Sequence, residues 1–116
     1  MENHYLIMKW SYHYDKEGTW FDDDEGMLGC ELQPMTHFTL PHMERKRVEI
    51  LEVVQEGERI TATLKAAYDT FTVKNDGVEV TKHESDSYSA AGDSVHQSIA
   101  MTFTIEPKDH YVCSEE

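Results

Sequence analysis

Apolar and polar residues alternate along residues 4–14, and this alternation constrains the fold more than any other feature of the sequence. One face of an extended strand would carry Leu6, Met8, Trp10, Tyr12 and Tyr14. A period of two that is rich in aromatic residues is typical of a half-buried β-strand. Residues 96–105 repeat the pattern, and one of their faces would carry Ile99, Met101, Phe103 and Ile105. We therefore expect an antiparallel β protein whose strands bury one face each.

Shorter candidate strands lie between these two segments. They cover residues 27–32, with Gly29 as a candidate bulge, and residues 35–40, 59–66, 70–73 and 78–81. The last two flank Asn75-Asp76-Gly77, which predicts a hairpin because Asn, Asp and Gly favour the positive φ angles of tight turns. We expect loops at the acidic residues 22–26 and at the Ser-rich residues 85–94, and a turn at residues 15–18.

Residues 44–55 allow two interpretations. Val48, Leu51 and Val54 have helical spacing, and Pro41 would suit a helix start. The segment is also rich in β-branched residues, which favour strands. We predict a hairpin with strands at 46–55 and 59–66, and a short helix within 42–56 is the alternative.

The complete pattern predicts an all-β, single-domain antiparallel sandwich or up-and-down barrel of about seven to eight short strands. The domain would span residues 1–108, and residues 109–116 would form a polar tail. A chain of 116 residues has the length of one domain.

The formal net charge of −13 excludes several classes of partner. A field of that sign disfavours binding to nucleic-acid backbones and to anionic membranes. The charge is uneven, since residues 44–65 carry as many basic as acidic side chains. The negative excess therefore lies mainly in residues 15–25 and in the C-terminal third.

The two cysteines, Cys30 and Cys113, show no Cys-x-x-Cys spacing. The first residues have no basic segment followed by an apolar run, so we expect a cytoplasmic protein with reduced thiols. We expect Cys30 to pack in a strand core.

An acidic run provides the first candidate site. Asp22, Asp23, Asp24 and Glu25 are consecutive, and Trp20 lies beside them. Their spacing departs from that of a calcium-binding EF-hand loop. A solvated surface that keeps the protein soluble is the simplest interpretation, and a contact surface for a basic protein partner is the functional one.

Aromatic side chains provide the second candidate site. In a closed barrel, Trp10, Tyr12 and Tyr14 could line a cavity for a small apolar ligand, as in calycin-like barrels. Core packing is the competing interpretation for all three residues.

Seven histidines form the third candidate, but none has the spacing of a known metal motif. His13, His37 and His42 would have to converge in space to bind a metal ion. The sequence contains neither a Gly-x-Ser-x-Gly nucleophile motif nor a glycine-rich phosphate loop, and we predict no cofactor and no catalytic residue from it.

These candidates give three functional hypotheses. The leading one is a small acidic binding or inhibitory module for a basic protein partner. Small bacterial immunity proteins use this principle, and the analogy rests on charge and size alone. The second hypothesis is the ligand-binding barrel, and the third is a metal-dependent enzyme that uses histidines.

Overall fold

The computed structural model describes residues 4–16, 20–66 and 69–107. The side chains of Trp20, Phe21, Glu44, Arg45 and Ala90 are not among those described. Residues 17 and 18 of the expected turn, the tail expected at 109–116 and Cys113 therefore lie outside the described part. Asp15 and Lys16, the first half of that expected turn, belong to a strand.

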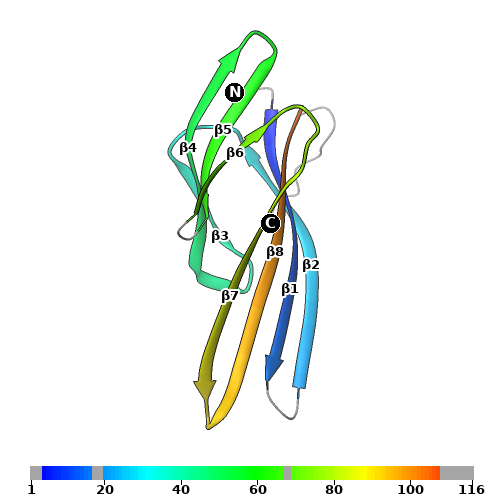
Figure 1. Cartoon of the computed structure of the whole chain (residues 1–116), viewed down its shortest axis with the longest axis vertical. Helices are drawn as coiled ribbons and strands as arrows, with labels where there is room; N and C mark the ends of the chain where they lie inside the picture. The colour runs from blue at the N-terminus through cyan, green and yellow to red at the C-terminus, as the bar shows by residue number, and fades with distance from the viewer. Residues whose placement is uncertain (1–3, 17–19, 67–68, 108–116) are drawn as a thin grey trace.

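Eight strands make up the described chain (Figure 1). They are β1 (His4–Lys16), β2 (Trp20–Glu31), β3 (Thr36–Leu40), β4 (Met43–Glu56), β5 (Arg59–Ala66), β6 (Asp69–Lys74), β7 (Val80–Ala90) and β8 (Asp93–Pro107). All neighbouring strands pair antiparallel, as the alternating pattern predicts.

The strands form two four-stranded sheets. Sheet A has the order β2-β1-β8-β7, and sheet B has the order β3-β4-β5-β6. The fold is thus an all-β sandwich, which confirms the predicted class and decides between a sandwich and a closed barrel.

The helix considered for residues 42–56 is wrong, because β4 occupies that segment. Val48 is fully buried, whereas the side chains of Leu51 and Val54 are 39% and 42% exposed. The residues with helical spacing therefore do not share a buried face. A register shift between Ile50 and Glu52 marks a bulge in the strand.

The loop predicted at residues 22–26 is also wrong. Asp22 to Gly26 continue the edge strand β2, which pairs with β1 in one unbroken register through to Glu31. Asp is rare in strands, but an edge strand can carry its carboxylates in solvent. The bulge considered at Gly29 is absent from this register.

The hairpin predicted around Asn75-Asp76-Gly77 is wrong, since β6 belongs to sheet B and β7 to sheet A. The segment crosses between the sheets, and Asn75 attaches it to β5. The Asn75 side chain accepts a hydrogen bond from the Ile60 N–H at 2.9 Å and donates one to the Glu58 carbonyl at 2.9 Å.

The loop predicted at residues 85–94 is wrong as well. Strand β7 runs to Ala90, and β8 begins at Asp93. Ala91 and Gly92 connect them with φ angles of 54° and 84°. Two consecutive positive φ angles match the right-handed twist of a tight hairpin, so a two-residue turn suffices.

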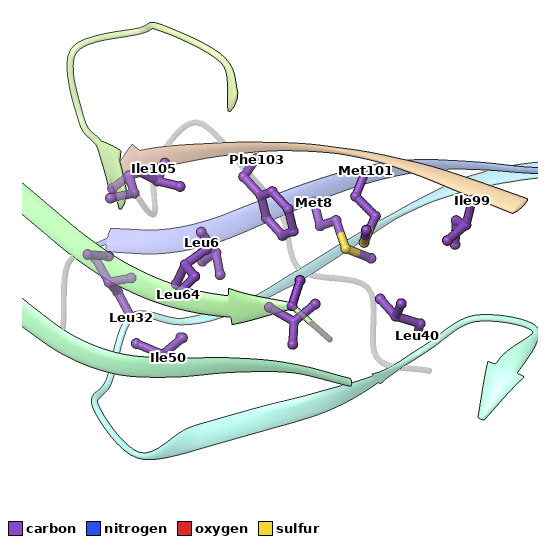
Figure 2. Close-up of a cluster of buried hydrophobic side chains, with 14 of the residues drawn as sticks. Leu6, Met8, Leu32, Leu40, Ile50, Leu64, Ile99, Met101, Phe103 and Ile105 are labelled. Atoms are coloured by element: carbon purple, nitrogen blue, oxygen red, sulfur yellow. The ribbon is translucent and has the colours of Figure 1, made fainter. Parts of the chain in front are cut away.

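The hydrophobic core fills the space between the sheets (Figure 2). Leu6, Met8, Met101 and Phe103 of sheet A point toward sheet B, where Leu64 is fully buried. The faces predicted from the alternation at 4–14 and 96–105 are confirmed. Trp10, Tyr14 and Cys30 pack against this core while partly exposed.

We expect Asn75→Ala to lower the free energy of unfolding by about 1–3 kcal/mol, because it leaves the Ile60 N–H and the Glu58 carbonyl without these partners. Asp76→Ala is the control, since Asp76 is exposed and bonds only to the nearby Val78 N–H. Its cost should stay below about 1 kcal/mol. Equal costs in urea denaturation would contradict the anchoring role of Asn75.

Candidate binding face

The registers of sheet A arrange its inner side chains in rows across the four strands. Residues directly opposite each other on neighbouring strands point to the same face. The row through Met8 is apolar and consists of Leu28, Met8, Phe103 and Val80. The next two rows, through Trp10 and then through Tyr12, contain an increasing number of charged side chains.

The row through Tyr12 has an apolar centre and acidic ends. It consists of Asp24, Tyr12, Ile99 and Glu84. Tyr12 and Ile99 are buried, at 6% and 1% exposure. Asp24 meets a side chain from the turn between β3 and β4, and Glu84 meets one from β4.

His42 reaches Asp24 from the turn between β3 and β4. Its Nε2 lies 2.7 Å from Asp24 Oδ2. Its ring stacks on Tyr12 with 4.4 Å between centroids, and it meets Trp10 edge-on at 5.6 Å. His42 has a φ of 65°, which is uncommon for a residue other than glycine. The ring contacts and the bond to Asp24 together stabilise this conformation.

Lys46 of β4 holds the other end of the row. Its Nζ lies 3.3 Å from Glu84 Oε1, and both side chains are largely buried. We call the His42–Asp24 and Lys46–Glu84 pairs the two clamps. They tie the start of β4 and the turn before it to both edge strands of sheet A.

Sheet A continues beyond the two clamps, whereas sheet B does not. In Figure 1 the β1–β2 and β7–β8 hairpins extend well past the lower end of sheet B. The inner side of this extension carries Asp22, Tyr14, Gln97, Asp86, Lys16, Val95 and Tyr88, which we call the open face.

The charges and rings of the open face lie close together. Asp22 and Asp86 are exposed and make no salt bridge or side-chain hydrogen bond within the described chain. Tyr88 is 46% exposed, and it lies opposite the buried Val95. Lys16 Nζ is 3.7 Å from Asp93 Oδ2. The open face therefore combines tyrosine rings with carboxylates that have no cationic partner in the described residues.

Tyr12 lies at the boundary between the core and the open face. Its hydroxyl donates a hydrogen bond to Gln97 Oε1 at 2.7 Å. Burial raises the pKa of Tyr12 above its ordinary value, and the nearby Tyr88, Tyr14 and Asp22 add to the rise. The raised pKa keeps the Tyr12 hydroxyl in the protonated form that donates to Gln97.

Gly26 makes room for Trp10 on the inner face of sheet A. A Cβ atom at Gly26 would lie 2.6 Å from Trp10 Cζ2, so the indole occupies the space of a missing side chain. Trp10 Nε1 is buried and has no hydrogen-bond acceptor within the described residues. Trp10 thus serves as packing between the core and His42.

The structure divides the acidic run predicted as a partner site. Asp22 and Asp24 lie on the inner face of β2, and Asp23 and Glu25 lie on the outer face. Asp23 Oδ1 contacts His13 Nδ1 at 2.5 Å on that outer face. The side chain of Trp20, the fifth predicted residue, lies outside the described part.

The predicted ligand residues Trp10, Tyr12 and Tyr14 lie in three successive inner rows and not around a barrel interior. A shallow depression of about 550 Å³ lies nearby, where Lys9, Ser11, Met27, Ala100 and Thr102 belong to the outer face of sheet A. Trp10 contributes to its lining, but Tyr12 and Tyr14 do not.

The histidines considered as metal ligands do not converge. His13 and His42 bind different carboxylates on opposite faces of β2, and His37 is exposed on β3. Among the described residues, no three His, Cys, Asp or Glu side chains are placed to hold a metal ion. The described chain also contains no helix that could cross a membrane.

Several residues of this region escaped the sequence analysis. Glu84, Asp86 and Tyr88 alternate within the Ser-rich segment, and this period of two was a usable sign of a strand. His42 was considered only as a metal ligand, and neither its pairing with Asp24 nor that of Lys46 with Glu84 has a local sign, since the partners lie far away in the sequence. Comparisons with protein-family models, with curated proteins and with solved structures found no match for this chain.

The Asp24 carboxylate makes the stability of the protein depend on pH. The hydrogen bond with His42, followed by that from the Glu25 N–H, lowers the pKa of Asp24 below its ordinary value of 3.8. Its stabilising contribution is therefore fully present above the ordinary value and is lost as the pH falls through the lower folded-state value. We expect wild type to exceed Asp24→Asn in stability at pH 5 and the difference to shrink below pH 3.8.

His42→Ala provides the matched background for this comparison. Because His42 is the largest cause of the lowered pKa, Asp24→Asn should cost less stability there. Chemical denaturation of the four proteins between pH 5 and pH 2.5 measures both effects. A cost that is constant with pH, or equal in both backgrounds, would refute the role given to this clamp.

Proposed function

We propose that this chain is a binding module that holds a basic segment of a partner protein on its open face. The row of Asp22, Tyr14, Gln97 and Asp86 carries this proposal. It lies on the inner side of sheet A, beyond the two clamps, and neither of its carboxylates has a cationic partner in the described residues.

The charge of the whole chain favours a basic partner. A net charge of −13 raises the encounter rate with cationic proteins and lowers it with anionic ones. The neutral balance of residues 44–65 leaves the excess outside the β4–β5 hairpin. Electrostatic steering would therefore favour approach toward sheet A.

The tyrosines give the open face a second kind of contact. A tyrosine ring offers apolar area together with a polar edge, and its face attracts Lys and Arg cations. The chain already contains one such contact, since Lys82 Nζ lies 4.9 Å from the centre of the Phe71 ring. Tyr14 and Tyr88 can receive the side chains of a basic segment in the same way.

The two alternative functions have less support. A ligand-binding barrel requires an enclosed interior, but the sandwich core is filled by side chains such as Phe103, Leu64 and Met8. A histidine-based metal enzyme requires converging ligands, which the described residues do not provide. The basic-partner hypothesis is the one that the charge and the open face both favour.

The direct test uses a probe peptide with four consecutive Lys or Arg residues flanked by Val and Thr. We expect its affinity to fall at least tenfold between about 25 and 250 mM salt. Asp22→Asn combined with Asp86→Asn should weaken binding about three- to tenfold at low salt, because two exposed charge pairs are lost. Titration calorimetry, with amide chemical shifts to map the contact, gives both results.

Glu52→Gln combined with Glu56→Gln is the matched control, since it changes the net charge equally at exposed positions of β4. It should change the affinity by less than about twofold. A peptide in which Gln replaces every basic residue should not bind. Equal losses in the two double variants, or binding that is independent of salt, would count against the open face.

A further inference from the structure

We infer that the bound segment is extended and joins sheet A as a fifth strand along the outer edge of β2. This inference rests on the basic partner of the proposed function and moves its backbone contact to the β2 side of the open face. Asp22 then contacts the segment directly, whereas Asp86 of β7, three strands away, acts on it only through the field of the face. The partner segment would carry Lys or Arg at consecutive positions.

Strand β2 is a long edge strand whose protection against pairing consists of its carboxylates, which repel acidic strands but attract basic ones. Natural edge strands are commonly short, bulged, or interrupted by Pro or Lys. β2 has 12 residues in an unbroken register and contains none of these interruptions. The other edge of sheet A, β7, contains Lys82, and the β3 edge of sheet B has only five residues, with a register shift, between Pro34 and Pro41.

The outer edge of β2 has free pairing capacity over residues 22–27. Within the described chain, no backbone hydrogen bond joins these residues to anything except β1. The Glu25 N–H donates only to the side chain of its neighbour, Asp24 Oδ1, at 2.9 Å. An added strand could bind to such an edge through its own backbone.

The placement of the carboxylates favours an added strand over binding to one face. Asp22 and Asp24 point inward, whereas Asp23 and Glu25 point outward. A basic segment lying on either face would meet only two of them. An extended strand beside β2 places alternate side chains on both faces, so that consecutive Lys or Arg residues can approach all four carboxylates.

The same charges disfavour a second copy of this chain at the edge. Two β2 strands paired with each other would bring like charges together, which destabilises cross-strand pairs. The acidic run would thus select a basic strand and reject an identical one. A symmetric dimer through β2 is therefore not the expected occupant.

The decisive experiment uses two N-methylated versions of the basic probe peptide, which keep its charge. One carries methyl groups on the backbone nitrogens of even positions and the other on those of odd positions. Only one edge of an added strand pairs with β2, so one version should lose at least tenfold in affinity. The other should stay within about twofold of the parent peptide. The amides of residues 22–27 that point away from β1 should become protected from hydrogen exchange with the parent peptide and with the tolerated version, but not with the other version.

The outcomes separate this inference from the proposed function. Equal affinities of the two methylated peptides, whether both are retained or both are lost, overturn strand addition. The proposed function then stands if the parent peptide still binds in a salt-dependent way that Asp22→Asn and Asp86→Asn weaken. If the parent does not bind at low salt, both proposals fail. Dimerisation of the chain through β2, seen by sedimentation, would also overturn the inference.

Discussion

The point at which hydrophobic packing between the two sheets ends determines the rest of this structure. The inner side chains of β1 from Leu6 to Tyr12 are covered by sheet B, and the two clamps close the sandwich at the row of Tyr12 and Ile99. Sheet A continues beyond this row because the long antiparallel pairing of β1 with β8 supports it. The extension therefore keeps its backbone ordered, and apart from the buried Val95 its inner face carries half-buried and exposed side chains.

Two carboxylates on β2 illustrate the consequence of this boundary. Asp24 and Asp22 lie two residues apart and share one face of the strand. Asp24 meets His42 of the turn between β3 and β4 and helps to close the sandwich, whereas Asp22 is exposed and makes no salt bridge or side-chain hydrogen bond within the described chain. Aspartate thus stabilises the sandwich at position 24 and is exposed to solvent at position 22, two residues away on the same face.

The sequence predicted the parts of the fold that depend on local periodicity. The alternation at 4–14 and 96–105 identified the buried faces of β1 and β8 because aromatic and β-branched residues dominate those faces. It failed where composition opposed the strand state. The Asp run and the Ser-rich segment have weak strand propensity, and only pairing with β1 and β8 keeps them extended.

The candidate face was predictable only in part. Once β2 is known to be a strand, the division of Asp22 and Asp24 from Asp23 and Glu25 follows from the sequence alone. The position of His42 does not, because its contacts with Asp24 and Tyr12 are tertiary and its positive φ has no local signature. The end of sheet B could not be predicted either, since it depends on how the two sheets are offset.

The central claim is that the face beyond the clamps is exposed and strongly negative. Paramagnetic relaxation by small soluble probes measures this property directly, with a cationic and a neutral nitroxide of similar size. The account predicts that the cationic probe relaxes the ring protons of Tyr14 and Tyr88 several-fold more than the neutral probe. The methyl groups of Val54, on the charge-balanced β4–β5 hairpin, should respond similarly to both probes. Equal relaxation of the tyrosine rings by the two probes would contradict the account.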